Sequence, residues 1–574
     1  MSARGGRLGG ALAIALALGF AAKLAAVLWA LDRGFELGDE GYSLLNLNHP
    51  RDAPVVFQFY RLLAPFGGAL RFEVVDARLL RLAAEALGSV ALVAGVHAWW
   101  RARFAARGAM PALALVLFCL LGVLLGTGSR SLTYNDVTNL CSYAAIGALF
   151  YALATDDARR RTLAALAGGV CNGLQLGVKF PTALALPVLA ALALGLLFRG
   201  LPARERLRMA AAWTAGVALA IALYLAANGS VSGLLAEIRR MPEVARSTGY
   251  DPLRLLLFYA KGEAITALHV VAGCAVLAAS FGLLRGRLAR DRALAAAWIC
   301  CAVALAVGVR LLHPFFLHPT LVYLSALLAC AGLLLVASLR GARGAAPSLA
   351  PLWLLVALPF VEIAGTNVPI SERLPTHALP LFAALGILSL ELRARSGSAW
   401  LHAAVALTLL AATSALFVRH HLVAPYGLPS GVTEQRHAVG GLPGVRVDAA
   451  TKAFLESVSD ALRGAGFRPG DPVLALDFMP GLVFYLGGTS PGFTLYVFDN
   501  PRLNCFNVNR FYRTPPYLIL GRPMLREQAD CLEAFSFPAD FRPVRSVRFP
   551  YEAVYADFGA ADFTHVHLYA PRER

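Results

Sequence analysis

Long apolar runs recur along most of this chain and constrain what it can fold into. Residues 11–31 read ALAIALALGFAAKLAAVLWAL and residues 113–126 read LALVLFCLLGVLLG, with Lys23 as their one charged residue. A helix of about 20 such residues crosses the hydrocarbon core of a bilayer. Because 58% of all residues are hydrophobic and only 15% are charged, a soluble core cannot hide this surface. The pattern predicts a polytopic α-helical membrane protein.

Counting apolar runs of about 17–23 residues predicts about thirteen spanning helices. If the N-terminus is cytoplasmic, an odd number of spans places the C-terminus outside. We expect the spans near residues 9–31, 80–100, 110–127, 138–154, 162–178, 181–198, 209–227, 264–284, 293–310, 320–338, 351–366, 378–392 and 400–418.

The placement of the positive charge predicts the orientation of the chain. The formal net charge is +17, and arginines cluster in short tracts between apolar runs. Arginine-rich loops stay on the cytoplasmic side, so this charge orients the protein and does not indicate nucleic-acid binding. The Ala/Arg-rich, Lys-poor composition is typical of a GC-rich bacterium, so we expect the chain to lie in the inner membrane. We also expect the first span to stay uncleaved. The tracts are RARFAARG (101–108), RGLPARERLR (199–208), RGRLARDR (285–292) and RARSG (393–397).

Three segments outside the membrane are longer than a tight turn. They are the first external loop at 32–79, a second loop at 228–263 and a tail at 419–574. The tail is long enough for its own core, so we divide the chain into a membrane domain, 1–418, and a periplasmic domain, 419–574. Within the tail, residues 449–466 have helical apolar spacing. DPVLALDF, FTLYVFDN, PYLILG and THVHLYA are typical of strands, which predicts an α/β domain.

An acidic pair stands directly after the first span, in ELGDEGYSLLNLNHP (36–50). Carboxylates at a lipid boundary are costly unless they are solvated, paired or used. Asp39 and Glu40 are therefore either ordinary solvated loop residues or part of a functional site. Taken by themselves, the two residues leave both interpretations open.

The position of this pair resembles the GT-C glycosyltransferases, in particular the branch with the protein O-mannosyltransferases and the lipid A aminoarabinose transferase. FQFYRLLAPFGG (57–68) resembles the amphipathic surface helix of that family, and VVDARLLRLAAEALGSV (74–90) resembles its return into the second span. The resemblance implies transfer of a sugar from a polyprenyl-phosphate donor to a glycan, lipid or protein acceptor. It implies that Asp39 contacts the attacking group, which must lose a proton. Glu40 then orients the acceptor or helps to bind Mg or Mn, since the family has metal-dependent and metal-independent members.

A further acidic residue lies in SRSLTYNDVTN (129–139), at the outer turn between the third and fourth spans. Family members often have an acidic residue there, so the resemblance adds Asp136 to the candidate catalytic residues. The alternative is a helix cap, because Asp136 precedes an apolar run and aspartate is a good capping residue.

Several cations are candidates for binding the phosphate of the donor, whose negative charge must be stabilised as it leaves. Each is equally compatible with a cation at a helix end that reaches lipid headgroups. The histidines lack HExxH spacing, so the sequence does not predict a zinc site. The candidates are Lys179, Arg310, His313, His318, Arg373 and His377.

Two pairings are also predicted. Lys23 and Glu85 lie at similar depth in adjacent spans, which favours a structural ion pair. Cys505 and Cys531 are the two cysteines of the outer tail, where an oxidising compartment favours a disulfide.

Two other functions compete with an inverting glycosyltransferase. A transporter or flippase explains the spans and the intramembrane charges, but it does not explain a long acidic first loop joined to a folded outer domain. Transporters also tend to show internal symmetry, which we do not detect. A ligase that uses a diphosphate carrier normally has its large loop late in the chain, whereas here the extended loops come early.

Overall fold

The computed structural model describes most of the chain. The described residues are 3–50, 59–67, 72–103, 109–126, 129–228, 252–291, 350–366, 374–396, 399–492, 501–524, 526–531, 535–557 and 563–572, with scattered residues of 231–239 and 294–301.

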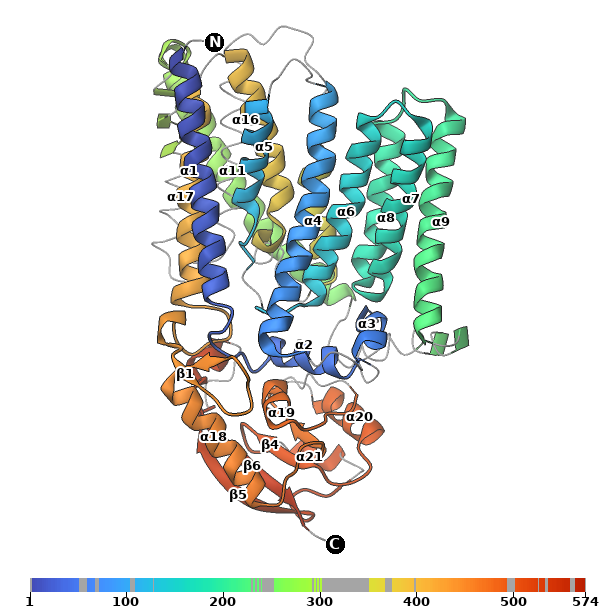
Figure 1. Ribbon diagram of the computed structural model, residues 1–574, viewed down its shortest axis with the longest axis vertical. Helices are drawn as coiled ribbons and strands as arrows, with labels where there is room; N and C mark the ends of the chain where they lie inside the picture. Colours follow the sequence, from blue (N-terminus) through green and yellow to red (C-terminus); the bar gives the residue numbers. More distant parts are fainter. Residues whose placement is uncertain are drawn as a thin grey trace.

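Long helices form one bundle, with the N-terminus at its far end from the C-terminal strands (Figure 1). Each described helix of the bundle overlaps a run predicted to span. The predicted spans at 293–310 and 320–338 lie almost entirely outside the described residues. The helices are α1 (Ala3–Trp29), α4 (Val74–Arg103), α5 (Ala109–Cys119), α6 (Tyr134–Ala154), α7 (Ala158–Leu174), α8 (Phe180–Leu196), α9 (Ala203–Asn228), α11 (Pro252–Arg290), α14 (Leu352–Ile363), α16 (Leu379–Ser396) and α17 (Ala399–Phe417).

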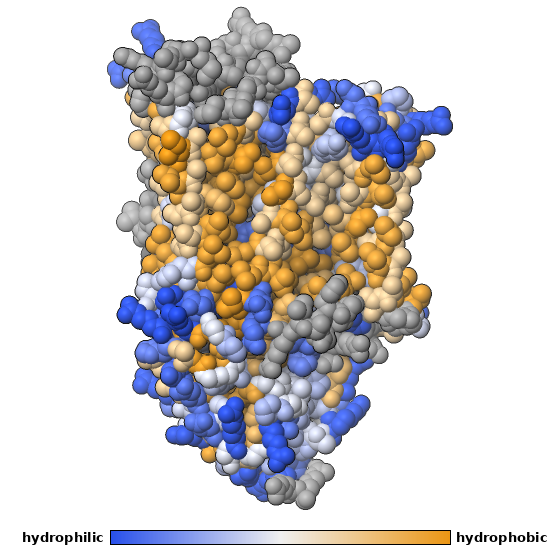
Figure 2. Space-filling model, viewed as in Figure 1, coloured by the Kyte–Doolittle hydropathy of each residue, from blue (hydrophilic) through white to orange (hydrophobic). Residues whose placement is uncertain are grey.

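The surface of the bundle suits a lipid bilayer. Among the described residues, five helices are long and apolar enough to cross a membrane: Leu8–Trp29, Val74–Arg103, Tyr134–Ala154, Ala203–Ala227 and His402–Val423. Large apolar side chains such as Leu18, Leu87 and Val188 are exposed, and Figure 2 shows a broad apolar band over the bundle. Such a band is solvated by lipid tails and marks a membrane-embedded protein.

Small residues let α4 and α6 approach closely. A Cβ atom on Gly95 would overlap the backbone of Gly147, and one on Gly147 would overlap the backbone of Ala91. Helices in membranes associate through such close contacts, because lipid provides no hydrophobic force between them. We call this contact the α4–α6 seam.

Strands and short helices fill the C-terminal part. Four strands have the order β3-β4-β6-β5, with β3 and β4 parallel and the other two pairs antiparallel. The residues of the predicted strand FTLYVFDN lie outside the described part. The strands are β1 (His437–Ala438), β2 (Arg446–Val447), β3 (Val473–Ala475), β4 (Tyr517–Leu520), β5 (Phe541–Arg548) and β6 (His565–Pro571), and the helices are α18 (Ala449–Gly464), α19 (Pro480–Leu486), α20 (Pro501–Phe511), α21 (Arg526–Cys531) and α22 (Glu552–Asp557).

Local chemistry explains several of these elements. The carboxylate of Asp448 accepts the backbone N–H of Thr451 at 3.0 Å and caps α18. Gly466, with φ of +100°, follows the end of this helix, in the left-handed conformation that glycine adopts easily. Along β6, Val566, Leu568 and Ala570 are buried in alternation, as expected for a half-buried strand.

Two short helices of the first external loop lie between the bundle and the C-terminal strands, α2 (Asp39–Asn48) and α3 (Phe59–Gly67) (Figure 1). A single hydrophobic core includes residues of this loop, such as Phe35 and Leu44, together with Phe454 and Leu568 of the C-terminal part. The two predicted domains therefore share a continuous core across their boundary.

The predicted pair of Lys23 and Glu85 is wrong. Lys23 Nζ donates to Thr413 Oγ1 of α17 at 2.8 Å. Glu85 Oε1 accepts the backbone N–H of Leu124 at 2.7 Å. In the structure the two side chains face different neighbours, Thr413 for Lys23 and the backbone of Leu124 for Glu85.

Cys505 takes part in a disulfide, as predicted. Its predicted partner, Cys531, ends α21, and the side chain of Cys531 is outside the described part. The identity of the partner stays a prediction.

Candidate active site

The acidic motif after α1 begins α2 and is held by a third carboxylate, Glu36. Glu36 Oε1 accepts the backbone N–H groups of Gly38 at 2.6 Å and Asp39 at 2.8 Å, and its Oε2 accepts the N–H of Glu40. These donors have no partner within the helix, so a carboxylate at this end stabilises it. Burial and the charges of Asp39 and Glu40 raise the pKa of Glu36 well above its usual value, against the opposing effect of these hydrogen bonds.

Glu40 is fully buried and is held by a bidentate ion pair. Arg78 of α4 donates from Nε to Oε1 at 2.8 Å and from Nη2 to Oε2 at 2.7 Å. The hydroxyl of Ser131 donates to Oε1 at 2.7 Å. Burial alone would raise the pKa of Glu40, but the charge and hydrogen bonds of Arg78 outweigh it and lower the pKa. Both oxygens of Glu40 are therefore engaged in holding the loop.

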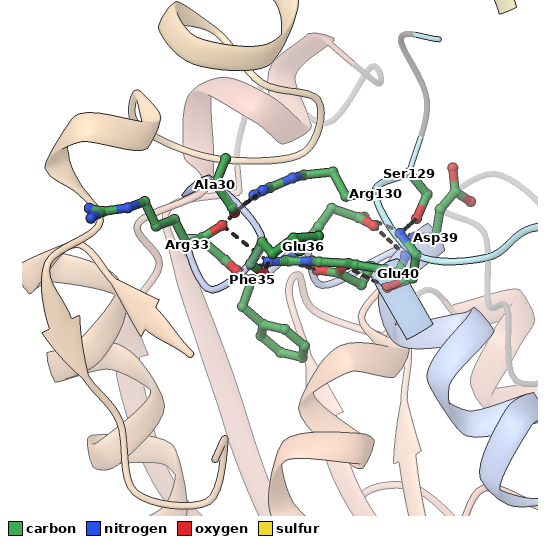
Figure 3. A network of polar contacts seen from close by, with 12 residues as sticks. Ala30, Arg33, Phe35, Glu36, Asp39, Glu40, Ser129 and Arg130 are labelled. Atoms are coloured by element: carbon green, nitrogen blue, oxygen red, sulfur yellow. Dashed lines mark hydrogen bonds and ion pairs between the residues drawn. The ribbon is translucent and has the colours of Figure 1, made fainter. Parts of the chain in front are cut away.

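Two arginines bind the backbone of the loop that leads to α2. Arg78 donates to the carbonyls of Leu31 at 2.6 Å and Gly34 at 2.8 Å. Arg130 donates to the carbonyls of Ala30 and Arg33. Figure 3 shows the contacts of Arg130 with Ala30 and Arg33 within a network of polar contacts around residues 30–40. The start of α2 thus has a single well-defined position.

Asp39 lies at the edge of this network (Figure 3) and is only partly buried. Its Oδ2 accepts a hydrogen bond of 2.7 Å from the hydroxyl of Tyr426. Its Oδ1 accepts no hydrogen bond from any residue that the structure describes. Of the three carboxylates at the start of α2, Asp39 alone combines solvent exposure with an oxygen that is open within the described part.

Asp136 completes the capping box of α6. Its Oδ2 accepts the backbone N–H of Thr133 at 2.8 Å and the hydroxyl of Thr133 at 2.7 Å. Its Oδ1 accepts from Arg81 Nε at 3.2 Å. Asp136 is buried, and this geometry matches the capping alternative, with Thr133 as the N-cap residue.

Lys179 and His377 lie together in a buried polar cluster around Glu362 of α14. Lys179 Nζ donates to the carbonyl of Glu362 at 2.5 Å, and His377 Nδ1 lies 3.3 Å from Glu362 Oε2. The other predicted phosphate ligands, Arg310, His313, His318 and Arg373, lie outside the described residues.

Within the described part, no group of three or more His, Cys, Asp or Glu residues is suited to hold a metal ion. Asp39 and Glu40 do not form an open pair for Mg or Mn, because both oxygens of Glu40 face Arg78 and Ser131. We derive no step through a metal.

The C-terminal part supplies contacts that the sequence did not reveal. Tyr551 donates to the carbonyl of Phe35 at 2.6 Å, and the backbone N–H of Gly481 donates to the carbonyl of Leu37, also at 2.6 Å. A Cβ atom on Gly41 would overlap the backbone of Gly481, so α2 and α19 pack at backbone distance. We call these contacts, together with the bond from Tyr426 to Asp39, the loop–sheet interface.

Sequence signals for the missed residues differ. Arg78 and Arg81 are three residues apart at the outer end of the second span, where a charged residue near lipid calls for a partner. The cost of an unpaired charge near lipid therefore identifies both arginines as ion-pair residues from the sequence. Tyr426 is separated from Asp39 by 387 residues, and no motif surrounds it.

No protein-family model matches the chain, and no curated protein matches it. Two crystal structures of ArnT from Cupriavidus metallidurans resemble it, one in the apo state and one bound to undecaprenyl phosphate. Both alignments cover 96% of this chain and 97% of the other, with 14% and 13% identity and TM-scores of 0.42 and 0.40.

Proposed function

We propose that this chain is a membrane glycosyltransferase of the GT-C type, which its first loop resembles. It transfers a sugar from a polyprenyl-phosphate donor to an acceptor on the outer face of the bacterial inner membrane. The proposal places the N-terminus in the cytoplasm and residues 419–574 in the periplasm. The observation that carries it is the geometry of Asp39, a fixed and partly exposed carboxylate next to an apolar bundle.

Asp39 acts as the general base in this proposal. An acceptor hydroxyl or amine gives its proton to Oδ1 as it attacks the anomeric carbon. The bond from that carbon to the phosphate oxygen breaks, and the polyprenyl phosphate leaves with the electron pair. The other two carboxylates at the start of α2 are engaged by backbone N–H groups and by Arg78, so none is placed to form a covalent sugar intermediate. A single displacement inverts the anomeric configuration.

The leaving phosphate needs fixed cations near the membrane surface. Arg81 and Arg130 line a small cleft beside the outer end of α1, and we propose this cleft for the phosphate. Arg310, His313 and Arg373 stay candidates from the sequence. Lys179 is less suited, because its ammonium group is buried against the carbonyl of Glu362.

The test is Asp39→Asn in full-length protein in lipid nanodiscs. The probe is the mixture of polyprenyl-phosphate sugars extracted from the host membranes, with the glycans of a deletion strain as acceptor. We expect turnover to fall about 10²–10⁴-fold, the range for loss of a general base, while donor binding survives. Asp460→Asn, an exposed carboxylate of α18, is the matched control and should keep full activity.

Other outcomes would contradict the proposal. A folded Asp39→Asn protein with near-normal sugar transfer would remove Asp39 as the base, and a product with retained configuration would exclude the single displacement. A wild-type protein that moves lipid-linked sugar across a bilayer without forming a glycosidic bond would favour the flippase. Loss of wild-type activity with chelator would show a metal that this geometry does not predict.

A further inference from the structure

We propose that Tyr426 is a positioning residue for Asp39 and that it makes the C-terminal part a working part of the active site. The inference rests on the proposed function, because it assigns Tyr426 a role in aiming the base. The hydroxyl of Tyr426 donates to Asp39 Oδ2 at 2.7 Å, across a separation of 387 residues. The bond joins the segment that follows the bundle to the first residue of α2.

The turn that carries Tyr426 is itself fixed on the first loop. Leu428 N donates to the carbonyl of Pro425 at 3.2 Å and closes the turn. A Cβ atom on Gly427, which has φ of +68°, would overlap the side chain of Glu36, and one on Gly34 would overlap Leu428. The backbone on both sides of Tyr426 therefore packs against the segment that positions Asp39.

A strained loop of the C-terminal part, at Asp477 and Phe478, also packs against the segment that positions Asp39. Asp477 and Phe478 both have φ of 65°, a conformation that costs free energy for residues other than glycine. Asp477 Oδ2 accepts the N–H of Gly521 at 3.0 Å, and Tyr555 donates to the carbonyl of Phe478 at 2.8 Å. The ring of Phe478 fills the space beside Gly38, where a Cβ atom would overlap it. Gly38 directly precedes Asp39.

Fixing one oxygen of Asp39 directs the other. A partly exposed aspartate has more than one accessible rotamer, and a general base must lie within hydrogen-bond reach of the proton that it takes. With Oδ2 held by Tyr426, Oδ1 keeps one direction and accepts no hydrogen bond from the described residues. Tyr426 also lies in the chain segment that follows the last helix of the bundle. Asp39 is therefore held in position only when the C-terminal part is docked on the first loop.

The competing explanation is that Tyr426 only stabilises the loop–sheet interface. Tyr512→Phe is the matched control, because it also removes one buried phenol hydroxyl from the C-terminal part, and that hydroxyl donates to the carbonyl of Val473 at 2.9 Å. Two readouts separate the explanations. They are the kcat and KM of sugar transfer, and the dependence of the Tyr426→Phe effect on Asp39.

The experiment compares Tyr426→Phe, Tyr512→Phe, Asp39→Asn, Asp39→Ala and the double variants of Tyr426→Phe with each change at Asp39, all full-length in nanodiscs. We expect Tyr426→Phe to lower kcat by about 10–100-fold, the scale of a misplaced reacting group, with the KM for donor nearly unchanged. Tyr512→Phe should keep kcat within about twofold of wild type. In the Asp39→Asn background, Tyr426→Phe should cause no further loss of turnover.

The melting temperatures provide a readout that does not need activity. If the hydroxyl and the carboxylate contact each other, the shift of Tyr426→Phe/Asp39→Ala will be smaller than the sum of the two single shifts. Additive melting shifts in that pair, or an equal loss of kcat from Tyr426→Phe and Tyr512→Phe, would overturn the role of Tyr426. A wild-type protein without transfer would instead refute the proposed function, and the melting shifts would still decide whether Tyr426 holds Asp39.

Discussion

The α4–α6 seam and the loop–sheet interface hold the molecule together by different means. The seam joins two apolar helices through glycines such as Gly95 and Gly147. The loop–sheet interface joins residues 387 and 516 positions apart through hydrogen bonds, as Tyr426 to Asp39 and Tyr551 to Phe35 show. The seam lies within the bundle at the level of the apolar band, whereas the interface lies outside that band (Figures 1 and 2).

The comparison shows why the loop before α2, residues 30–38, needs buried charge. Residues 30–38 have little regular structure, so their backbone carbonyls lack helix or strand partners. Arg78 satisfies several of these carbonyls, and Glu40 neutralises Arg78. In the α4–α6 seam, the backbone hydrogen bonds are already made within each helix, so small residues in close contact are enough to hold the two helices together.

The largest expected effect follows from Glu40→Gln, which leaves Arg78 buried without its anionic partner. Breaking a buried ion pair from one side costs about 3–5 kcal/mol, so the melting temperature should fall strongly. Glu456→Gln removes an exposed pair with Lys452 and should cost less than about 1 kcal/mol. Equal shifts for the two variants would show that the position of residues 30–38 does not depend on buried charge.

The same variant gives a pH test. The pKa of Glu40 is lowered from its ordinary value of 4.5 in the folded protein, so its stabilising contribution is present above pH 4.5 and is lost as the pH falls through the folded pKa. The stability gap between wild type and Glu40→Gln should therefore be widest above pH 4.5 and close below it. A gap that widens on acidification would contradict the charge pairing.

Next in size is the disulfide of Cys505, a residue of α20 in the C-terminal part. A disulfide closed between Cys505 and Cys531 would contribute about 3 kcal/mol, so Cys505→Ser should lower the melting temperature of the C-terminal part. Peptide mapping under non-reducing conditions should identify Cys531 as the partner. Cys301→Ser, at an exposed free thiol, is the control. A free thiol on Cys531 in the folded protein would refute the pairing.

The smallest expected loss of stability comes from adding one methyl group to the contact of α2 with α19 or to the α4–α6 seam. Gly41→Ala crowds the contact of α2 with α19, and Gly95→Ala crowds the α4–α6 seam. Both should cost about 1–3 kcal/mol through overpacking, measured by thermal unfolding in the same lipid. Gly282→Ala, where a Cβ atom meets nothing within 4 Å, should not destabilise. A neutral Gly41→Ala would show that α2 can shift away from α19.

Much of the bundle was predictable because hydropathy is a local property. Runs such as 9–31 and 80–100 predicted α1 and α4 within a few residues, since about 20 apolar residues in sequence must cross the bilayer as a helix. Asp39 was also found locally, because it follows the first span directly. The division of the chain at residue 418 stays a prediction, although a shared core crosses it.

The roles of the charged residues were decided by tertiary structure. Position in the sequence did not separate Asp39 from Glu40, and only the family resemblance gave them different roles. In the structure, helix α2 turns Glu40 toward Arg78 and leaves Asp39 to Tyr426. Lys23 and Glu85 fail as a pair for the same reason: the rise of a helix determines depth from sequence, whereas packing determines which neighbour each side chain faces. Contacts between distant residues follow from that packing, and no local pattern encodes them.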